Sequence, residues 1–182
     1  MEQSSVELRD FLRPDVFETI SKELSDAFWS EAPLMGPPNV RQYLAAKPTT
    51  PVVKDLARFL RSTKFASLLK SLTSLDVIKG SQELRRFSRG HYTLIHDQAL
   101  EPTGLDVTLS LTQKTEWDDE EWGGATHYIA DADELLRIQP ATNSLALVLR
   151  DEGVLRFVKY LNHLAEQDRQ EISMVFIEQP EE

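Results

Sequence analysis

The sequence of 182 residues contains no cysteine, only seven glycines and fewer basic than acidic residues. The absence of cysteine excludes disulfides, thiolate zinc sites, iron–sulfur clusters and cysteine nucleophiles. Any metal site would therefore need His and carboxylate ligands. The 20 Lys and Arg residues against 30 Asp and Glu residues give a net charge of −10, which disfavours direct binding to nucleic acid and to anionic membranes.

Long apolar runs are missing as well, because charged residues interrupt every hydrophobic stretch before it could form a transmembrane helix. Residues 1–10 lack the basic start and apolar segment of a secretory signal, so we expect an intracellular protein. Neither a phosphate-binding glycine motif nor a Gly-x-Ser-x-Gly elbow is present, which disfavours nucleotide-dependent enzymes and serine hydrolases. The length and the 41% hydrophobic content predict a single domain over residues 1–182.

Residues 1–80 are predicted to be mainly helical. The first helix starts at Pro14 and is expected to end near residues 29–31. Its apolar stripe is formed by Val16, Phe17, Ile20, Leu24, Ala27 and Phe28. Thr50 as cap and Pro51 in the first turn predict a second helix, and residues 64–72 a third.

From Leu84 onward the hydrophobic period changes to two, which is typical of strands. Val107, Leu109 and Leu111 alternate with polar residues, and residues 145–149 are continuously apolar. Further strands are expected near residues 155–158 and 174–177, separated by short turns. Helices followed by many short strands predict an α+β domain whose helices pack on a β-sandwich or barrel.

The segment from Phe87 to His96 has a spacing of aromatic residues, glycine and histidine that is typical of a known enzyme family. Phe87, Gly90, Tyr92 and His96 have the order and spacing that lead to the metal-binding His in the 2-oxoglutarate- and iron-dependent dioxygenases of the prolyl-hydroxylase type. The later features that match this family are Trp117, Gly123, Gly124, the strand from Asn143 to Leu149, Arg169 and Ser173. The chain therefore resembles this family over residues 84–177, and the resemblance implies a double-stranded β-helix, a cupin-like jelly roll.

The helices, residues 29–43 and residues 116–124 carry a narrower resemblance, to the carboxy-terminal domain of the two-domain ribosomal-protein prolyl hydroxylases. This resemblance implies a parent chain that hydroxylates a proline of a small-subunit ribosomal protein, with Fe(II) and 2-oxoglutarate bound by its other domain. It also implies a location in nucleus and cytoplasm and, in fungi, a role in degrading a sterol-responsive transcription factor. The expected partners are proteins, including the catalytic domain of the same polypeptide.

The departures from the family pattern concern the metal ligands. The family's carboxylate stands two residues after the His, where this chain has Gln98, and the adjacent Asp97 should point to the opposite face of a strand. The place of the second His falls on Arg156, whose guanidinium cannot become a ligand. We therefore expect no metal, cofactor or catalytic residue in this domain. The predicted function is that of a noncatalytic pseudo-dioxygenase domain for protein interaction and regulation, with Arg156 paired inside the barrel with Asp97 or another acid.

Other residues are candidates for binding. Arg169 matches the family's cosubstrate-anchoring basic residue, although a surface cation near Asp168 and Glu171 is an equally good interpretation. The candidate partner contacts, taken as exposed aromatic and acidic side chains, are Trp117, Trp122, Glu120 and Glu121. An alternative interpretation is that the Trp and Gly-Gly residues pack at a strand turn.

Two alternative functions remain open at the sequence level. One is an active dioxygenase that uses His96, Asp97 and either His127 or His163 as an altered ligand set. The other is a metal-free sensor that binds 2-oxoglutarate or another dicarboxylate through Arg169. The plainer interpretation of His163 is a side chain that faces solvent.

Overall fold

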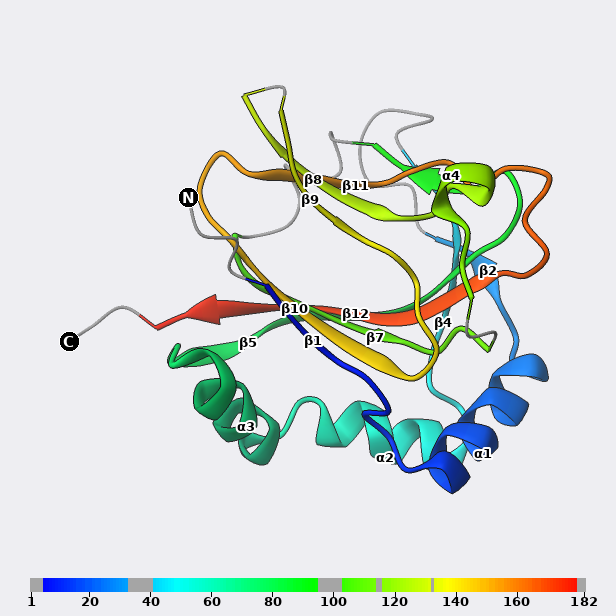
Figure 1. Ribbon diagram of the computed structural model, residues 1–182. Helices are drawn as coiled ribbons and strands as arrows, with labels where there is room; N and C mark the ends of the chain where they lie inside the picture. Colours follow the sequence, from blue (N-terminus) through cyan, green and yellow to red (C-terminus); the bar gives the residue numbers. More distant parts are fainter. Residues whose placement is uncertain (1–4, 33–40, 95–102, 114–115, 132, 180–182) are drawn as a thin grey trace.

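Two β-sheets face each other, and helices cover the outer face of the larger sheet (Figure 1). The structure is a computed structural model that describes residues 5–32, 41–94, 103–113, 116–131 and 133–179. The helices are α1 (Pro14–Ser25), α2 (Pro51–Phe59), α3 (Thr63–Thr73) and the single turn α4 (Asp119–Trp122). Among the described residues, no helix is long and apolar enough to cross a membrane.

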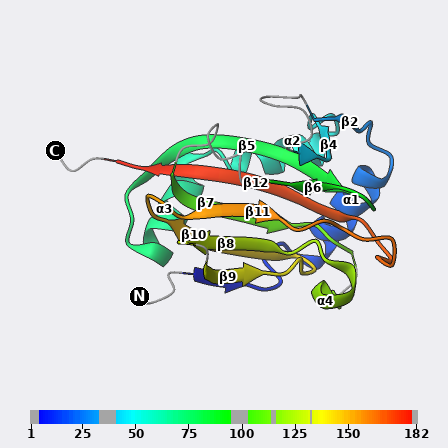
Figure 2. The same ribbon diagram turned by 90° about the horizontal axis from the view of Figure 1, so that it is seen from above.

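Strands occur in the amino-terminal as well as the carboxy-terminal part of the sequence. In chain order they are β1 (Ser5–Leu8), β2 (Ser30–Glu31), β3 (Arg41–Gln42), β4 (Leu44–Ala46), β5 (Val77–Phe87), β6 (Tyr92–Thr93), β7 (Gly104–Ser110), β8 (Thr126–Ala130), β9 (Asp133–Ile138), β10 (Ser144–Arg150), β11 (Leu155–Val158) and β12 (Arg169–Glu178). The larger sheet has the order β1-β10-β7-β12-β5-β4-β2, the smaller sheet that faces it has the order β11-β8-β9, and β3 pairs separately with β6. Seen from above, the smaller sheet lies over the larger one, with α4 at one end (Figure 2).

The predicted starts of the helices are confirmed, but the predicted end of the first helix is wrong. Pro14 and Pro51 stand in the first turns of α1 and α2, where a missing N–H costs nothing. Helix α1 ends at Ser25, and the indole Nε1 of Trp29 donates a hydrogen bond to the carbonyl oxygen of Leu24 at 3.2 Å. Phe28, expected in the buried stripe, therefore lies beyond the helix and is 84% exposed.

The amino-terminal segment also supplies strands that the hydrophobic pattern did not predict. Strand β1 pairs antiparallel with β10, with Ser5 opposite Val148 and Leu8 opposite Leu145. Strand β5 begins at Val77, seven residues before the predicted change of period, and pairs with β12. The first 80 residues thus form the helical layer and both edges of the larger sheet, with β1 at one edge and β4 and β2 at the other.

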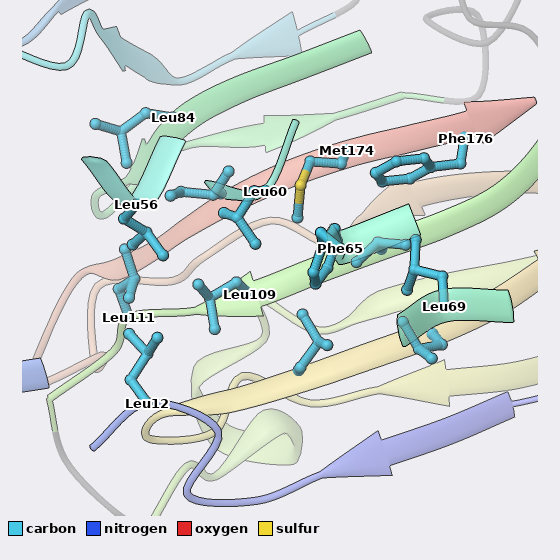
Figure 3. Packing of buried hydrophobic residues seen from close by; sticks show 14 of the residues in the cluster. Leu12, Leu56, Leu60, Phe65, Leu69, Leu84, Leu109, Leu111, Met174 and Phe176 are labelled. Atoms are coloured by element: carbon cyan, nitrogen blue, oxygen red, sulfur yellow. The ribbon is translucent and has the colours of Figure 1, made fainter. Parts of the chain in front are cut away.

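The main hydrophobic core lies between the helices and the larger sheet (Figure 3). Phe65 of α3 is fully buried, and its ring lies 5.9 Å from that of Phe176 on β12. Strand alternation directs Leu105, Val107 and Leu109 of β7 into this core. The intervening residues of the same strand must therefore face the smaller sheet, inside the barrel.

Candidate functional site in the barrel interior

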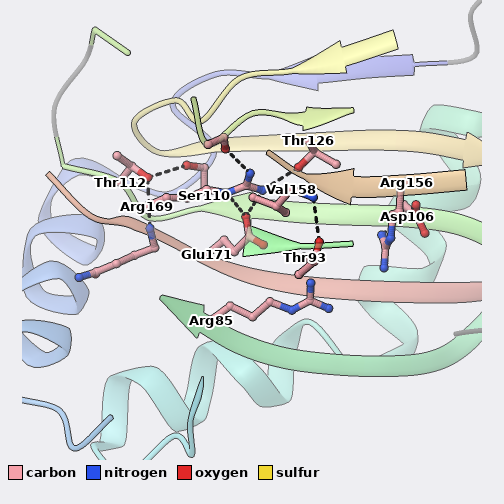
Figure 4. Close-up of polar contacts among 12 residues, drawn as sticks. Arg85, Thr93, Asp106, Ser110, Thr112, Thr126, Arg156, Val158, Arg169 and Glu171 are labelled. Atoms are coloured by element: carbon pink, nitrogen blue, oxygen red, sulfur yellow. Dashed lines mark hydrogen bonds and ion pairs between the residues drawn. The ribbon is translucent and has the colours of Figure 1, made fainter. Parts of the chain in front are cut away.

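The interior between the two sheets is lined by buried polar and charged side chains (Figure 4). The alternating polar residues of β7 belong to this lining, since Asp106 and Ser110 are 1% and 5% exposed. Of the three predicted ligand positions, His96 and Gln98 lie outside the described residues, as does Asp97. Arg156 lies on β11 of the smaller sheet and is 8% exposed.

Arg156 is neutralised by a carboxylate of the opposite sheet. Its Nη1 lies 2.8 Å from Oδ2 of Asp106 on β7. The same carboxylate accepts from Nε of Arg150 at 3.0 Å and from its Nη2 at 3.3 Å. The side chains of Asp106 and Arg150 are 0% and 1% exposed, so this pair is removed from solvent. The prediction that Arg156 pairs with an interior acid is confirmed, with Asp106 as the partner.

Tyr128 on β8 adds a phenol to this cluster. Burial raises the pKa of Tyr128, and the negative charge of Asp106 raises it further, while Arg156 acts in the opposite direction. The phenol therefore stays protonated at neutral pH. It contributes a neutral hydrogen-bonding group beside the ion pairs rather than an additional charge.

Arg169 forms a second buried cluster at the start of β12. Its Nε and Nη2 donate to Oε2 of Glu171 at 2.8 and 2.5 Å, and its Nη1 donates to the carbonyl oxygen of Gly124 at 2.5 Å. Nη2 also donates to Oγ1 of Thr126 at 2.8 Å, and the guanidinium lies over the ring of Phe87. The interpretation of Arg169 as a surface cation is wrong, because the residue is 3% exposed. Each nitrogen of the guanidinium has a partner within the chain, so a dicarboxylate would have to displace Glu171.

A third pair lies on β5. Oε2 of Glu83 accepts from Nε of Arg85 at 2.9 Å and from the hydroxyl of Tyr43 at 2.9 Å. The ring of Tyr43 lies under the guanidinium of Arg85 and beside the ring of Phe87. Charged groups at this end of the sheet are thus also paired with one another.

Sequence reasoning missed Asp106, Arg150 and Tyr128 as members of the interior. The signal that could have found two of them is a charged residue within or ending an apolar strand, as in the stretches around Asp106 and Arg150. Such residues are almost never buried without a partner of opposite charge. The pairing itself is invisible in the sequence, since these two residues are 44 positions apart.

Of the alternative ligand set, His127 and His163 lie away from the interior, and His96 is outside the described residues. His127 is next to Tyr128 on β8 and so faces the opposite side of the sheet. There its ring stacks on Phe157 at 5.0 Å, and its Nδ1 lies 2.5 Å from Oε2 of Glu134. His163 is exposed, as its plainer interpretation predicted.

The contact between His127 and Glu134 makes stability depend on pH. The hydrogen bond with His127 lowers the pKa of Glu134, so the contact stabilises the fold above the ordinary pKa of a Glu carboxyl and is lost as the pH falls through the lowered value. We expect Glu134→Gln to cost less than about 1 kcal/mol at pH 7, because the carboxylate is partly exposed. Urea unfolding across the acid range should show the difference from wild type shrinking as the carboxylate becomes protonated. A difference that persists undiminished at the acid end would contradict this origin.

The two tryptophans predicted as exposed contacts are buried, so that prediction is wrong. Trp117 and Trp122 are each 9% exposed and meet edge to face at 5.4 Å. Nε1 of Trp117 donates to the carbonyl oxygen of Gly123 at 2.8 Å. Gly124 has a φ of +74°, and a Cβ there would lie 2.8 Å from Cζ2 of Trp117. The motif therefore serves packing at a turn, as the alternative interpretation proposed.

The acidic side chains of the same segment do face solvent. Glu120 and Glu121 are exposed on α4. Together with the neighbouring acids and the edges of Trp117 and Trp122 they line a surface hollow of about 770 Å³. A role of Glu120 and Glu121 in partner binding stays a prediction.

The part of the interior that the structure describes does not fit an iron ion. Across the described ranges, no group of three or more His, Asp and Glu side chains could hold a metal. The carboxylate of Asp106 beside Arg156 already accepts hydrogen bonds from two guanidinium groups. A cation placed there would meet the positive charges of Arg150 and Arg156.

Comparison with known structures identifies the fold. The chain is similar to a prolyl hydroxylase from Trichoplax adhaerens solved in complex with a hypoxia inducible factor peptide fragment, with a TM-score of 0.69 and 13% identity over 97% of this chain and 84% of that chain. It is also similar to a 2-oxoglutarate–Fe(II) oxygenase family oxidoreductase from Burkholderia pseudomallei, with a TM-score of 0.70 and 10% identity over 95% and 84% of the two chains. The predicted double-stranded β-helix with helices packed on it is confirmed.

Curated relatives are prolyl hydroxylases. Prolyl 3-hydroxylase OGFOD1 of Xenopus laevis is 33% identical over 206 aligned positions, which cover 91% of this chain and 40% of the relative. The Mus musculus protein of the same name is 46% identical over 96 positions, 52% of this chain and 17% of the relative. The chain thus spans less than half the length of these relatives. The profile of one family, described as oxoglutarate and iron-dependent oxygenase degradation C-term, matches residues 1–182. The chain belongs to this oxygenase degradation C-terminal domain family.

Proposed function

We propose that this chain is a noncatalytic domain of a prolyl hydroxylase, in which the barrel has kept its fold and serves protein interaction and regulation. The observation that carries the proposal is the buried ion pair between Arg156 and Asp106. Arg156 stands at the place that the family pattern gives to a metal-binding His, and its guanidinium is bound to the opposite sheet. The ion pairs of this cluster support the proposal, because metal-dependent chemistry at this position would need open coordination positions.

The role that we propose for the parent chain is based on its relatives. We infer that the parent chain hydroxylates a proline of a small-subunit ribosomal protein through another domain, which holds Fe(II) and 2-oxoglutarate. The Xenopus laevis relative is named a prolyl 3-hydroxylase, and this chain aligns with only 40% of it, which leaves room for such a domain. The present domain would bind that catalytic domain and, in nucleus and cytoplasm, couple its activity to other proteins, including the degradation of a transcription factor in fungi.

A metal titration tests the proposal. We expect calorimetry with Mn(II), and with Fe(II) under anaerobic conditions, to show no saturable binding in the micromolar range, with or without 2-oxoglutarate. The physical reason is the repulsion between a divalent cation and the paired arginines of the interior. Micromolar binding that disappears in His96→Ala but persists in His163→Ala, a control at an exposed histidine, would overturn the proposal.

A further inference from the structure

A basic groove lies on the side of the molecule where α2 passes the edge of the larger sheet. Its volume is about 850 Å³, and its basic lining residues are Lys47, Lys54, Arg58 and Arg61. Four of the chain's 20 basic residues thus gather at one groove, although the chain as a whole carries a net charge of −10. This local reversal of charge distinguishes the groove from the acidic hollow beside α4.

The positive charge of the groove is only partly compensated. Among the described lining residues Glu83 is the one acid, and its carboxylate is already bound by Arg85 and Tyr43. Neither Lys47 nor Lys54 forms an ion pair with another residue that the structure describes. Arg58 pairs with Asp55, but both side chains are more than two-thirds exposed, and such pairs exchange easily for another anion.

The floor of the groove is apolar and lies beside the end of β4, at the residue where the pairing of β4 with β2 stops. Ala45, Ala46, Leu84 and Ile172 line the floor. Strand β2 covers β4 only at Leu44 and Ala45. Ala46 pairs with Leu84 of β5 on its inner side, and among the described strands none pairs with its outer edge. This floor could receive an apolar side chain of a bound peptide.

We infer that this groove binds an acidic peptide segment of a partner protein, with its carboxylates against the basic row and an apolar side chain on the floor. The inference rests on the proposed interaction role and adds the chemistry of the partner. A peptide fits better than a nucleic acid, because none of the groove's described lining residues is aromatic and could stack on bases. Lys54 and Arg58 lie on one side of α2, four residues apart, and would face successive acidic side chains.

Fluorescence anisotropy with a short labelled peptide of alternating Glu and Leu residues tests the inference. The wild-type chain should bind it saturably, more weakly as ionic strength rises, and should not bind the same peptide with Gln in place of Glu. The variant Lys54→Glu with Arg58→Glu should weaken binding about tenfold or more, since two favourable charge contacts become repulsive. A matched control, Arg9→Glu with Arg13→Glu, makes the same change in net charge at exposed sites outside the groove and should bind like wild type.

Three results would overturn the inference: no saturable binding of the acidic peptide, an equal loss in both double variants, or equal or tighter binding of a single-stranded oligonucleotide. Thermal melting of both variants checks that the fold is retained, which the exposure of the substituted side chains favours. Metal binding by the interior would overturn the proposed function without affecting this result. The two failures are therefore distinguishable.

Discussion

Replacing Asp106 with Ala is expected to lower the free energy of unfolding by about 3–5 kcal/mol, because the buried guanidinium groups of Arg150 and Arg156 then lose their shared carboxylate. Domains of this size have a total stability of about 5–15 kcal/mol, so the variant should be close to unfolding. Urea denaturation followed by circular dichroism measures the change. Asp106→Asn keeps the size and some hydrogen bonding but not the charge, and should fall between Asp106→Ala and wild type.

The control for this prediction is a carboxylate of the surface. Asp15 pairs with Arg13, but both side chains are more than half exposed, and Asp15→Ala should cost less than about 1 kcal/mol. If Asp106→Ala were as mild as Asp15→Ala, then Arg150 and Arg156 would have another way to satisfy their charges. The claim that the interior is closed by a desolvated cluster would then fail.

The position of the cluster explains why so large an effect is expected. Asp106 and Arg150 come from β7 and β10 of the larger sheet, whereas Arg156 comes from β11 of the smaller sheet. Arg169 makes a similar connection, from β12 to Gly124 and Thr126 of the smaller sheet's side. The two sheets are thus joined across the barrel by charged hydrogen bonds, which are stronger than neutral ones.

The elements that the sequence could predict are those whose signals are local. Pro14 and Pro51 mark helix starts through backbone chemistry, and these starts are where the structure has them. Strand β1 was not predicted, because the polar–apolar alternation of residues 5–8 extends over only four positions and the segment forms a strand through pairing with β10. The strand propensity of four residues is a weak signal by itself, and pairing with a neighbouring strand decides whether such a segment forms a strand.

The interior was harder to predict than the fold. The polar positions of β7 have the alternation of a sheet with one solvated face, yet Asp106 and Ser110 are buried inside the barrel. The role of Asn143 was also not predictable from the sequence. Its side-chain amide forms hydrogen bonds with the N–H and the carbonyl oxygen of Leu12, 131 positions away. A pattern of period two tells which residues share a face, but not what lies opposite that face.

Arg169→Ala is the second substitution with a large expected effect, again about 3–5 kcal/mol of unfolding free energy. The loss would leave Glu171 as an unpaired charge that is 2% exposed and would remove the donors to Gly124 and Thr126. The double variant Arg169→Met with Glu171→Leu removes both charges and should recover most of the loss, because well-packed apolar residues often replace a buried ion pair without cost. Urea unfolding of the two variants beside wild type gives both values.

Arg169 also allows a test that distinguishes the proposed interaction role from the alternative role as a sensor of 2-oxoglutarate. A sensor would be stabilised by its ligand, by about 2.7 kcal/mol at a concentration a hundred times the Kd. We expect no such stabilisation of the wild-type chain, because Glu171 already occupies the donors that a dicarboxylate would need. Thermal melting with increasing 2-oxoglutarate measures this, with succinate as a second dicarboxylate. A clear rise in melting temperature that is absent from the double variant, provided that variant is folded, would show that the ligand displaces Glu171, and Arg169 would then be a binding residue rather than a structural one.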